Sequence, residues 1–253
     1  MSMEAIIIHL FCIIDDELAD VKRHDQALLH PSEIVTIGAM YALKGGGYRA
    51  FYRWLSKNWR HLFPKLPEQS RLLRLLGHYR ALTDRFLRKP SFFTVMDSFG
   101  IETIHPIREG RSPDQVGKKG KSNHRWIVGV KWCPLINNRG EVVDWDWDTA
   151  NEHDQVFRPV AEQYNGETIT LTDSGFVLAD APPSNIKLCA RGTWNERMLI
   201  ETINSLVTVV FHSKKISQRA DVYIEARLAY MTALINILLI ITDGVLSFID
   251  FVL

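Results

Sequence analysis

The chain reads Thr94-Val95-Met96-Asp97 in its first half and Thr168-Ile169-Thr170-Leu171-Thr172-Asp173 in its second. Both segments are short, rich in β-branched and apolar residues, and end in an aspartate, a pattern that predicts buried strands with a carboxylate at the end of each. A third acid, Glu201, lies in a later helical pattern. Carboxylates that are far apart in sequence suit Mg²⁺, because this hard cation prefers oxygen ligands.

These three acids predict a catalytic metal centre. We expect Asp97, Asp173 and Glu201 to hold two Mg²⁺ ions, for which Mn²⁺ can substitute. In such a site one ion activates the attacking water or 3′ hydroxyl and the other stabilises the leaving oxygen, with the ions roughly 3.5 to 4 Å apart. The carboxylates would therefore act as ligands and not as covalent nucleophiles.

The segments around these acids follow the order strands, helix, strand, helix. Asn138-Arg139-Gly140 predicts a turn between two antiparallel strands. The predicted strands are residues 92–96, 126–130, 141–147 and 168–172, and the predicted helices are residues 154–164 and 194–211. A chain of 253 residues, of which 46% are hydrophobic, is long enough to bury a sizeable core.

The spacing around the third acid carries a resemblance to a known family. The chain has Trp194, then Arg197 after two residues, Glu201 after three more, and Thr208 after six more. This resembles the signature tyrosine, arginine, glutamate, lysine of DDE transposases of bacterial insertion sequences, although tryptophan replaces the tyrosine and Thr208 replaces the lysine. The resemblance covers most of the chain. It implies a ribonuclease-H-like core that cleaves DNA at the element ends and joins the 3′ ends to a target, with Arg197 orienting Glu201 or contacting a phosphate.

The region between the two aspartates follows the same family order. It reads as a basic loop, a strand, a hairpin turn, a second strand and a polar turn. The segments that carry this order are Gly117-Lys118-Lys119-Gly120-Lys121-Ser122, Trp126-Ile127-Val128-Gly129-Val130-Lys131, Asn138-Arg139-Gly140-Glu141-Val142-Val143 and Thr149-Ala150-Asn151-Glu152-His153-Asp154. The resemblance implies that Lys118, Lys119 and Lys121 contact the DNA backbone.

The N-terminal part of the chain reads as helical. Apolar residues recur at helical spacing from residue 6 to 18, Ser32 is a candidate N-cap for a helix over residues 33–43, and Gly45-Gly46-Gly47 would end that helix. A third helix is predicted from Tyr48 and a fourth over residues 70–87. They form either a helix-turn-helix that enters a DNA groove or a bundle that supports the core.

The predicted organisation is therefore α/β. Residues 1–90 form an all-α N-terminal region, and residues 91–253 form a catalytic domain with a ribonuclease-H-like mixed sheet flanked by helices. Residues 228–242 are apolar but too short for a bilayer span of about 20 residues, so we expect a buried helix behind the sheet and no membrane. The absence of a secretory signal pattern and three scattered cysteines without paired spacing predict a cytoplasmic protein.

The net charge of +1 conceals a strong segregation of charge. Residues 49–89 are strongly basic, whereas residues 141–180 are strongly acidic. The cations of the first segment are Arg49, Arg53, Lys57, Arg60, Lys65, Arg71, Arg74, Arg80, Arg85, Arg88 and Lys89. A basic segment can neutralise DNA phosphates while an acidic one holds metal, and we expect Arg71 and Arg74 to contact DNA. The other interpretation is that the basic helices serve solubility alone.

Two further functions stay open at this point. A domesticated or decayed transposase would keep the fold and the DNA binding but lose the reaction, and Thr208 in place of lysine fits that interpretation. A sugar hydrolase would use a pair of carboxylates without metal, so a chelator would not inhibit it. For an active transposase we expect a homodimer or higher oligomer on DNA, because the paired element ends must be cut in concert.

Overall fold

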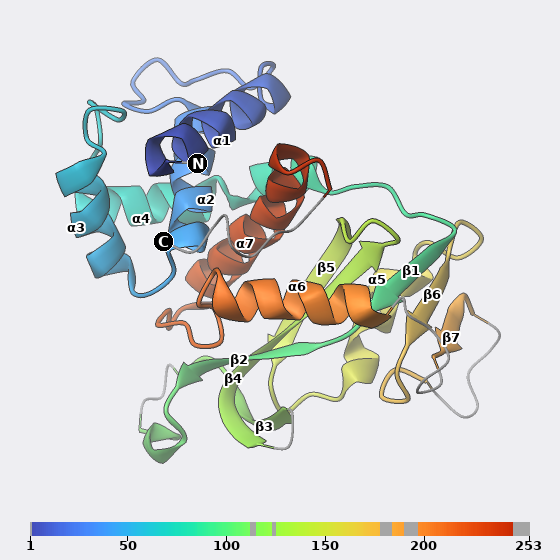
Figure 1. Cartoon of the computed structure of the whole chain (residues 1–253). Helices are drawn as coiled ribbons and strands as arrows, with labels where there is room; N and C mark the ends of the chain where they lie inside the picture. The colour runs from blue at the N-terminus through green and yellow to red at the C-terminus, as the bar shows by residue number, and fades with distance from the viewer. Residues whose placement is uncertain (1, 112–114, 123–124, 178–183, 190–196, 245–253) are drawn as a thin grey trace. The chain divides into compact units, whose positions relative to one another are not determined.

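The computed structural model of the chain describes residues 2–111, 115–122, 125–177, 184–189 and 197–244 (Figure 1). Its contacts divide the chain into two compact units. The sheet unit is Leu87–Val209, and the helical unit combines the chain up to Phe86 with the segment that begins at Val210. The boundary near residue 87 lies close to the predicted one at 90. The segment after Val210 was predicted to belong to the catalytic domain of residues 91–253. Its contacts instead group it with the N-terminal helices.

The sheet unit contains a seven-stranded mixed sheet, so the predicted α/β class is confirmed. The strand order is β2-β4-β1-β6-β7, and β3 and β5 also pair with β4. The strands are β1 (Phe93–Met96), β2 (Phe99–Ile104), β3 (Lys118–Ser122), β4 (Arg125–Asn137), β5 (Val142–Thr149), β6 (Ile169–Thr172) and β7 (Ile186–Leu188). Parallel pairing joins β1 to β6 and β6 to β7, and β4 pairs antiparallel with each of its neighbours.

Helices lie on both sides of this sheet, with α6 in front and α5 behind in Figure 1. The helical segments of the unit are η2 (Pro106–Arg108), η3 (Asp154–Phe157), α5 (Arg158–Glu162) and α6 (Arg197–Val209). Val160 and Ala161 of α5 pack in one buried cluster with Met96 of β1 and Leu135 of β4. On α6 the buried residues are Ile200, Ile203, Leu206 and Val207, which recur at helical spacing, and the helix contacts β1.

The sheet differs from the sequence prediction in two places. The residues predicted as a basic loop form β3, which pairs along β4 from Lys118 opposite Gly129 to Ser122 opposite Arg125. The close approach depends on glycine, because a Cβ on Gly120 would lie 1.7 Å from the backbone oxygen of Ala150. The predicted helix over residues 154–164 is a 3-10 turn followed by the short α5. Pro159 fits this break, since proline lacks the N–H that a continuous helix would use.

The helical unit is all-α in the described residues. Its elements are α1 (Met3–Glu17), α2 (Pro31–Lys44), α3 (Tyr48–Asn58), α4 (Gln69–His78), η1 (Arg80–Phe86) and α7 (Asp221–Ile241). The N-cap of α2 is His30 and not Ser32, because Pro31 already occupies the first helical turn. Gly45 ends α2 with a φ of 69°, a left-handed value that glycine adopts without strain, as the glycine run predicts.

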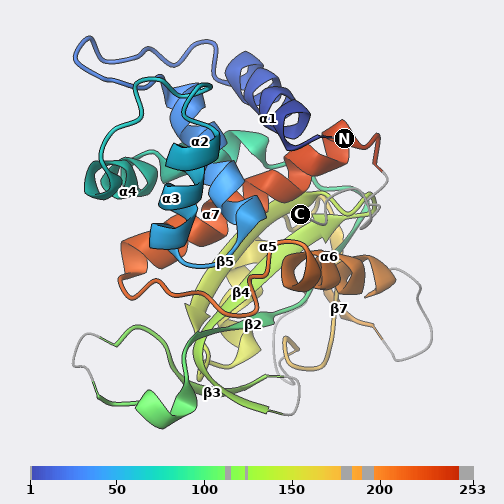
Figure 2. The same ribbon diagram turned by 60° about the vertical axis from the view of Figure 1, so that its left-hand side comes forward.

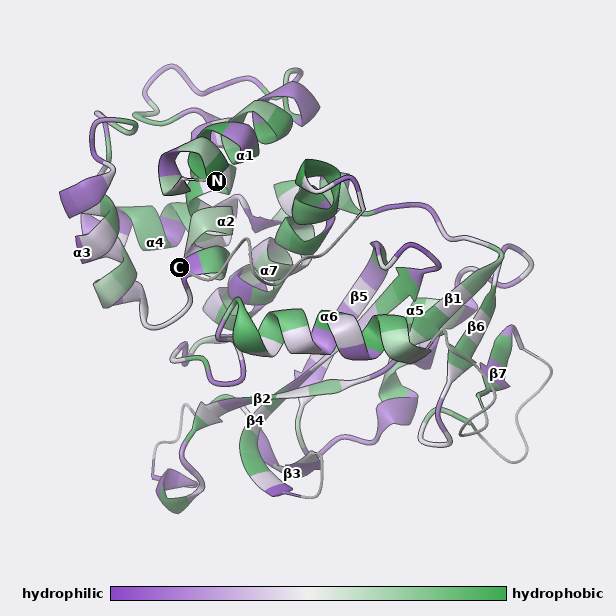
Figure 3. Cartoon of the chain, in the orientation of Figure 1, coloured by the Kyte–Doolittle hydropathy of each residue, from purple (hydrophilic) through white to green (hydrophobic). Residues whose placement is uncertain are grey.

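The long apolar helix α7 is the core of the helical unit. By length and composition it could cross a membrane, but 83% of its most apolar window is buried inside the structure, as in the core helix of a soluble protein. Figure 3 shows hydrophobic residues along it. The prediction of a buried helix is confirmed, whereas its expected place behind the sheet is not, because α7 packs on α2, α4 and η1.

Polar contacts fix α7 among these helices. The guanidinium of Arg227 donates to the backbone oxygens of Tyr41 and Ala42 at the end of α2 and stacks 4.3 Å from the centre of the Tyr41 ring. Burial lowers the pKa of Arg227, but a guanidinium stays charged at neutral pH. Asn236 donates to the backbone oxygen of Phe86 at 2.8 Å. These contacts join segments far apart in the sequence, which explains why apolar patterning alone misplaced the helix.

The packing of α7 on α2 predicts opposite effects for two identical substitutions. A Cβ on Gly38 in α2 would lie 2.4 Å from the Tyr230 ring of α7, so Gly38→Ala should destabilise the protein by about 1–3 kcal/mol. A Cβ on Gly77 in α4 meets nothing closer than 3.5 Å, so Gly77→Ala should stabilise by up to about 1 kcal/mol. Urea unfolding of both variants measures this contrast. Equal stabilisation by both would contradict the contact between α2 and α7.

Candidate functional site

The two predicted strands with terminal aspartates lie next to each other in the sheet. β1 and β6 are parallel, with Thr94 opposite Thr170 and Val95 opposite Leu171. Asp97 directly follows β1 and Asp173 directly follows β6, so continuing this register brings the two aspartates to the same edge. Neighbouring strands lie about 4.8 Å apart. The sheet therefore brings together two of the three predicted acids.

Each aspartate is oriented by the turn that follows its strand. Asp97 Oδ1 accepts a hydrogen bond of 2.8 Å from the backbone N–H of Ser98. Asp173 Oδ1 accepts one of 2.8 Å from the backbone N–H of Gly175. Both side chains are only partly buried. One oxygen of each carboxylate is thus fixed by the chain itself, and this fixing limits the rotation of both groups.

A fourth carboxylate, Asp154, lies beside these two and was missed in the sequence analysis. Its Oδ1 accepts hydrogen bonds from Ser98 Oγ at 2.7 Å and from Lys131 Nζ at 2.8 Å. The side chain of Lys131 is only 11% exposed, and Nζ also donates to the backbone oxygen of Glu152 at 2.7 Å. Asp154 stands in a polar turn of the sequence, and only the fold brings it to a lysine in the middle of β4. No local pattern indicates that contact.

Gly175 packs closely against two of these carboxylates. A Cβ at this position would lie 3.0 Å from Asp173 Oδ1 and 3.1 Å from Asp154 Oδ2. Both oxygen atoms therefore lie close to the backbone of Gly175, where a side chain would have to displace them. Carboxylate oxygens are the hard donors that Mg²⁺ prefers. The donor set fits the predicted ion in chemical type.

The acidic character of this region affects a neighbouring thiol. Cys133 of β4 is fully buried, and burial raises the pKa of its thiol well above the usual value. The negative charges of Asp97 and Asp154 raise this pKa further, while Lys131 lowers it. Cys133 therefore stays protonated at neutral pH and is inert as a metal ligand or nucleophile.

The third predicted acid, Glu201, is related to the two aspartates only through the contact of its helix with β1. Glu201 lies in α6 with an exposed side chain, next to the buried Ile200. Arg197 begins α6, but its side chain, like the whole of Trp194, lies outside the described residues. In the described part of the chain, no three His, Cys, Asp or Glu side chains form a group that could hold a metal ion. The structure assembles the pair of strand-end aspartates and places the helix of Glu201 against β1.

The three predicted DNA-binding lysines lie on the strand β3. Lys118, Lys119 and Lys121 are exposed, and Lys119 Nζ lies 5.6 Å from the centre of the Trp126 ring. Trp126 stands opposite Lys121 in the pairing with β4 and is 60% exposed. An exposed aromatic ring beside lysines is the combination that binds a nucleic-acid strand by stacking and charge. These lysines lie on a strand that is paired with β4, whereas the sequence analysis predicted a loop.

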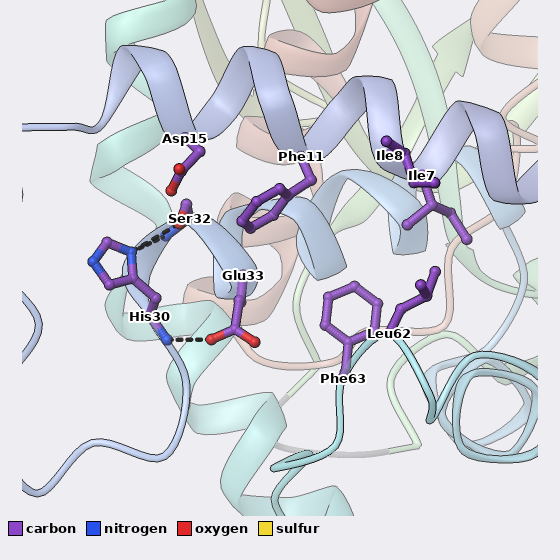
Figure 4. Close-up of a pocket in the computed structure, with 9 residues that line it drawn as sticks. All are labelled: Ile7, Ile8, Phe11, Asp15, His30, Ser32, Glu33, Leu62 and Phe63. Atoms are coloured by element: carbon purple, nitrogen blue, oxygen red, sulfur yellow. Dashed lines mark hydrogen bonds between the residues drawn. The ribbon is translucent and has the colours of Figure 1, made fainter.

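The described cavities lie in the helical unit. One of about 440 Å³ lies between α1, the start of α2 and Phe63 (Figure 4). Apart from Asp15, its polar groups already serve the cap of α2, because Glu33 accepts from the backbone N–H of His30 at 2.6 Å and His30 Nδ1 lies 2.8 Å from Ser32 Oγ. The rest of its lining is mainly apolar. This cavity is therefore a weak candidate for catalysis.

A second cavity, of about 670 Å³, has a strongly basic lining. The predicted DNA-binding residue Arg74 on α4 lines it together with Arg49 and Arg53 on α3. Arg71, the other predicted residue on α4, is exposed but does not line it. Of the two arginines of α4 that were predicted to contact DNA, only Arg74 therefore lines the cavity.

The ion pair beside the aspartates predicts a measurable effect on stability. Lys131→Met removes the ammonium that bonds to both Asp154 and the backbone of Glu152, so it should destabilise the protein by about 1.5–3 kcal/mol. Arg139→Met is the control, because Arg139 pairs with Glu141 at 2.9 Å but is 72% exposed, and exposed pairs contribute little. Chemical denaturation compares the two. A larger loss in Arg139→Met would contradict the importance of the buried lysine.

Comparison with known proteins finds no match. No family model, no curated protein and no solved structure matches this chain. The interpretation of the site therefore depends on the geometry described above and on the sequence pattern.

Proposed function

We propose that the protein is a metal-dependent transposase of the DDE type with a ribonuclease-H-like catalytic core. The observation that carries this proposal is the parallel pairing of β1 with β6, which brings Asp97 and Asp173 to one edge of the sheet. The element order supports it as well, because strands, a helical segment, strands and a helix follow one another from β1 to α6. The helix of Glu201 contacts β1, the strand that ends at Asp97.

In this proposal Asp97, Asp173 and Glu201 hold the metal. Two bound Mg²⁺ ions would activate the attacking hydroxyl and stabilise the leaving oxygen of a phosphodiester. Ser98 and Gly175 bond to the aspartates through their backbone N–H groups, which limits the rotation of both carboxylates. Lys131 offsets one of the negative charges and keeps Asp154 in place. The lysines of β3 would contact the DNA backbone, and Arg197 would orient Glu201 or contact a phosphate.

The runner-up is a transposase derivative that binds DNA but has lost the reaction. Thr208 stands where the related signature has lysine, and its hydroxyl donates to the backbone oxygen of Asn204 at 2.8 Å within α6. That hydroxyl is thus occupied inside its own helix, and the residue brings no positive charge. Both proposals predict DNA binding, so strand cleavage separates them. Inhibition by a chelator separates the active transposase from a sugar hydrolase.

Removing any one of the three acids should abolish cleavage without loss of DNA binding. We expect Asp97→Asn, Asp173→Asn and Glu201→Gln each to lower Mg²⁺-dependent strand cleavage by at least about 100-fold, because each metal contact is worth several kcal/mol of transition-state stabilisation. Glu196→Gln is the control, since Glu196 is the other acid of the same sequence segment, five positions before Glu201. Cleavage of a labelled duplex that carries the element end measures both. Full activity of Glu201→Gln would remove Glu201 from the site.

The lysines of β3 should contribute nonspecific electrostatic binding. Each phosphate that is neutralised steepens the fall of the binding constant with salt by about 0.9 in a log-log plot. Changing Lys118, Lys119 and Lys121 to alanine together should therefore flatten the slope by up to about 2.7 and weaken the binding of terminal and scrambled duplexes equally. Gel-shift titrations at several salt concentrations test this. An unchanged slope would exclude these lysines from the DNA contact.

A further inference from the structure

We infer that the groove between α3 and α4 binds the phosphate backbone of a DNA strand. It has a volume of about 670 Å³ and is lined by Arg49, Arg53 and Arg74, with no acidic residue in its lining. Figure 2 shows the ribbons of α3 and α4 near each other in the helical unit. The inference rests on the proposed function only in the choice of DNA as the nucleic acid. It concerns a different unit of the protein from the acidic edge of the sheet.

Two hydrogen bonds fix the position of α3 relative to the start of α4, on either side of the groove. The hydroxyl of Tyr48, at the start of α3, donates to the backbone oxygen of Gln69, at the start of α4, at 2.8 Å. Tyr52, one turn further along α3, donates to the backbone oxygen of Pro67 at 2.8 Å. These bonds tie the segment that leads into α4 to one face of α3. The first turns of both helices therefore line the same groove.

The three arginines of the groove carry uncompensated charge. In the described part of the chain none of them is within ion-pair distance of an acid, and all three are exposed. Arg49 and Arg53 are four residues apart, so they lie on the same face of α3, where like charges destabilise a helix. Arg74 faces them from α4. An anion in the groove would remove this repulsion and accept the paired N–H groups that a guanidinium presents.

The backbone adds to the positive potential of the groove. Gly47 caps α3 and Glu68 caps α4, and neither cap makes a side-chain hydrogen bond. The first N–H groups of a helix have no intrahelical acceptor and favour an anion. Gly47, Gln69 and Ser70 line the groove at these two starts. Arginines and helix starts thus point to the same ligand chemistry.

A DNA strand fits this arrangement better than a single small anion. Arg49 and Arg53 are about 6 Å apart along the axis of α3, at 1.5 Å per residue. Phosphates follow one another about every 3.4 Å along one strand of the duplex axis, so two arginines at this spacing can serve different phosphates. The groove is also open to solvent along exposed residues, as a continuous strand requires. We therefore expect up to three phosphate contacts from the arginines.

The test compares two triple variants that remove the same charge. The groove variant changes Arg49, Arg53 and Arg74 to alanine, and the control variant changes Lys57, Arg60 and Lys65, which are exposed in the same unit but do not line the groove. Binding of a fluorescent DNA duplex is measured by anisotropy over a range of salt concentrations. The groove variant should flatten the log-log salt slope by up to about 2.7 and weaken binding at least about tenfold at low salt. The control variant should change the slope by less than about 0.9.

A third variant and a competitor complete the test. Lysine at all three groove positions keeps the charge but loses the paired N–H donors, so it should keep the slope and bind more weakly than the wild type. Equal losses in the groove and control variants would overturn the inference, as would an unchanged slope in the groove variant. Inorganic phosphate that stabilises the wild type but not the groove variant, without any change in DNA binding, would identify a small-anion site instead. The assay detects binding alone, so it is independent of whether the protein cleaves DNA.

Discussion

The parallel pairing of β1 with β6 is the constraint on which the candidate site depends. Three buried threonines hold the two strands in register, because Thr94 Oγ1 lies 3.0 Å from Thr170 Oγ1 and accepts from Thr168 Oγ1 at 3.2 Å. Thr94 and Thr170 have no exposed surface. A slip of one residue would turn these side chains to the other face and leave buried hydroxyls without partners, which costs about 1–3 kcal/mol each. The same register aligns the two residues that follow the strands, Asp97 and Asp173.

Several carboxylates lie close together at this edge of the sheet, and the ammonium group of Lys131 neutralises part of their charge. Asp154 joins the strand-end aspartates, and Lys131 reaches it from the central strand β4. Because Ser98 bonds to Asp154 through its hydroxyl and to Asp97 through its backbone, the lysine also influences the turn that orients Asp97. Gly175 packs closely against the carboxylates of both Asp173 and Asp154. These features support the proposal of a metal-dependent reaction on DNA, in which charge repulsion between the acids is relieved by the bound cations.

The helical unit has a separate physical basis. Its central helix α7 is almost wholly buried, and the buried Arg227 is stabilised by the carbonyl groups at the end of α2. The basic residues stay on the outside, where Arg49, Arg53 and Arg74 line one groove. A core built on α7 leaves α3 and α4 free to present charge, since only Phe51 and Leu55 of α3 are buried. The proposed DNA contacts of this unit need no residue of the acidic edge of the sheet.

Local sequence patterns were enough to predict the elements that carry the candidate site residues. Strands ending at Asp97 and Asp173, the turn at Gly140 and the helix of Glu201 follow from β-branched runs, glycine and helical spacing, which are short-range properties. The α/β class follows from their order. Other features depend on contacts between distant residues, which no local pattern contains. The lysines of residues 118–122 led to the prediction of a loop, which is wrong, because pairing with β4 makes this segment the strand β3. No local pattern indicated that Asp154 pairs with Lys131. The apolar composition of α7 predicted a helix behind the sheet, but its hydrogen bonds to the backbone of Tyr41 and Phe86 place it among the N-terminal helices.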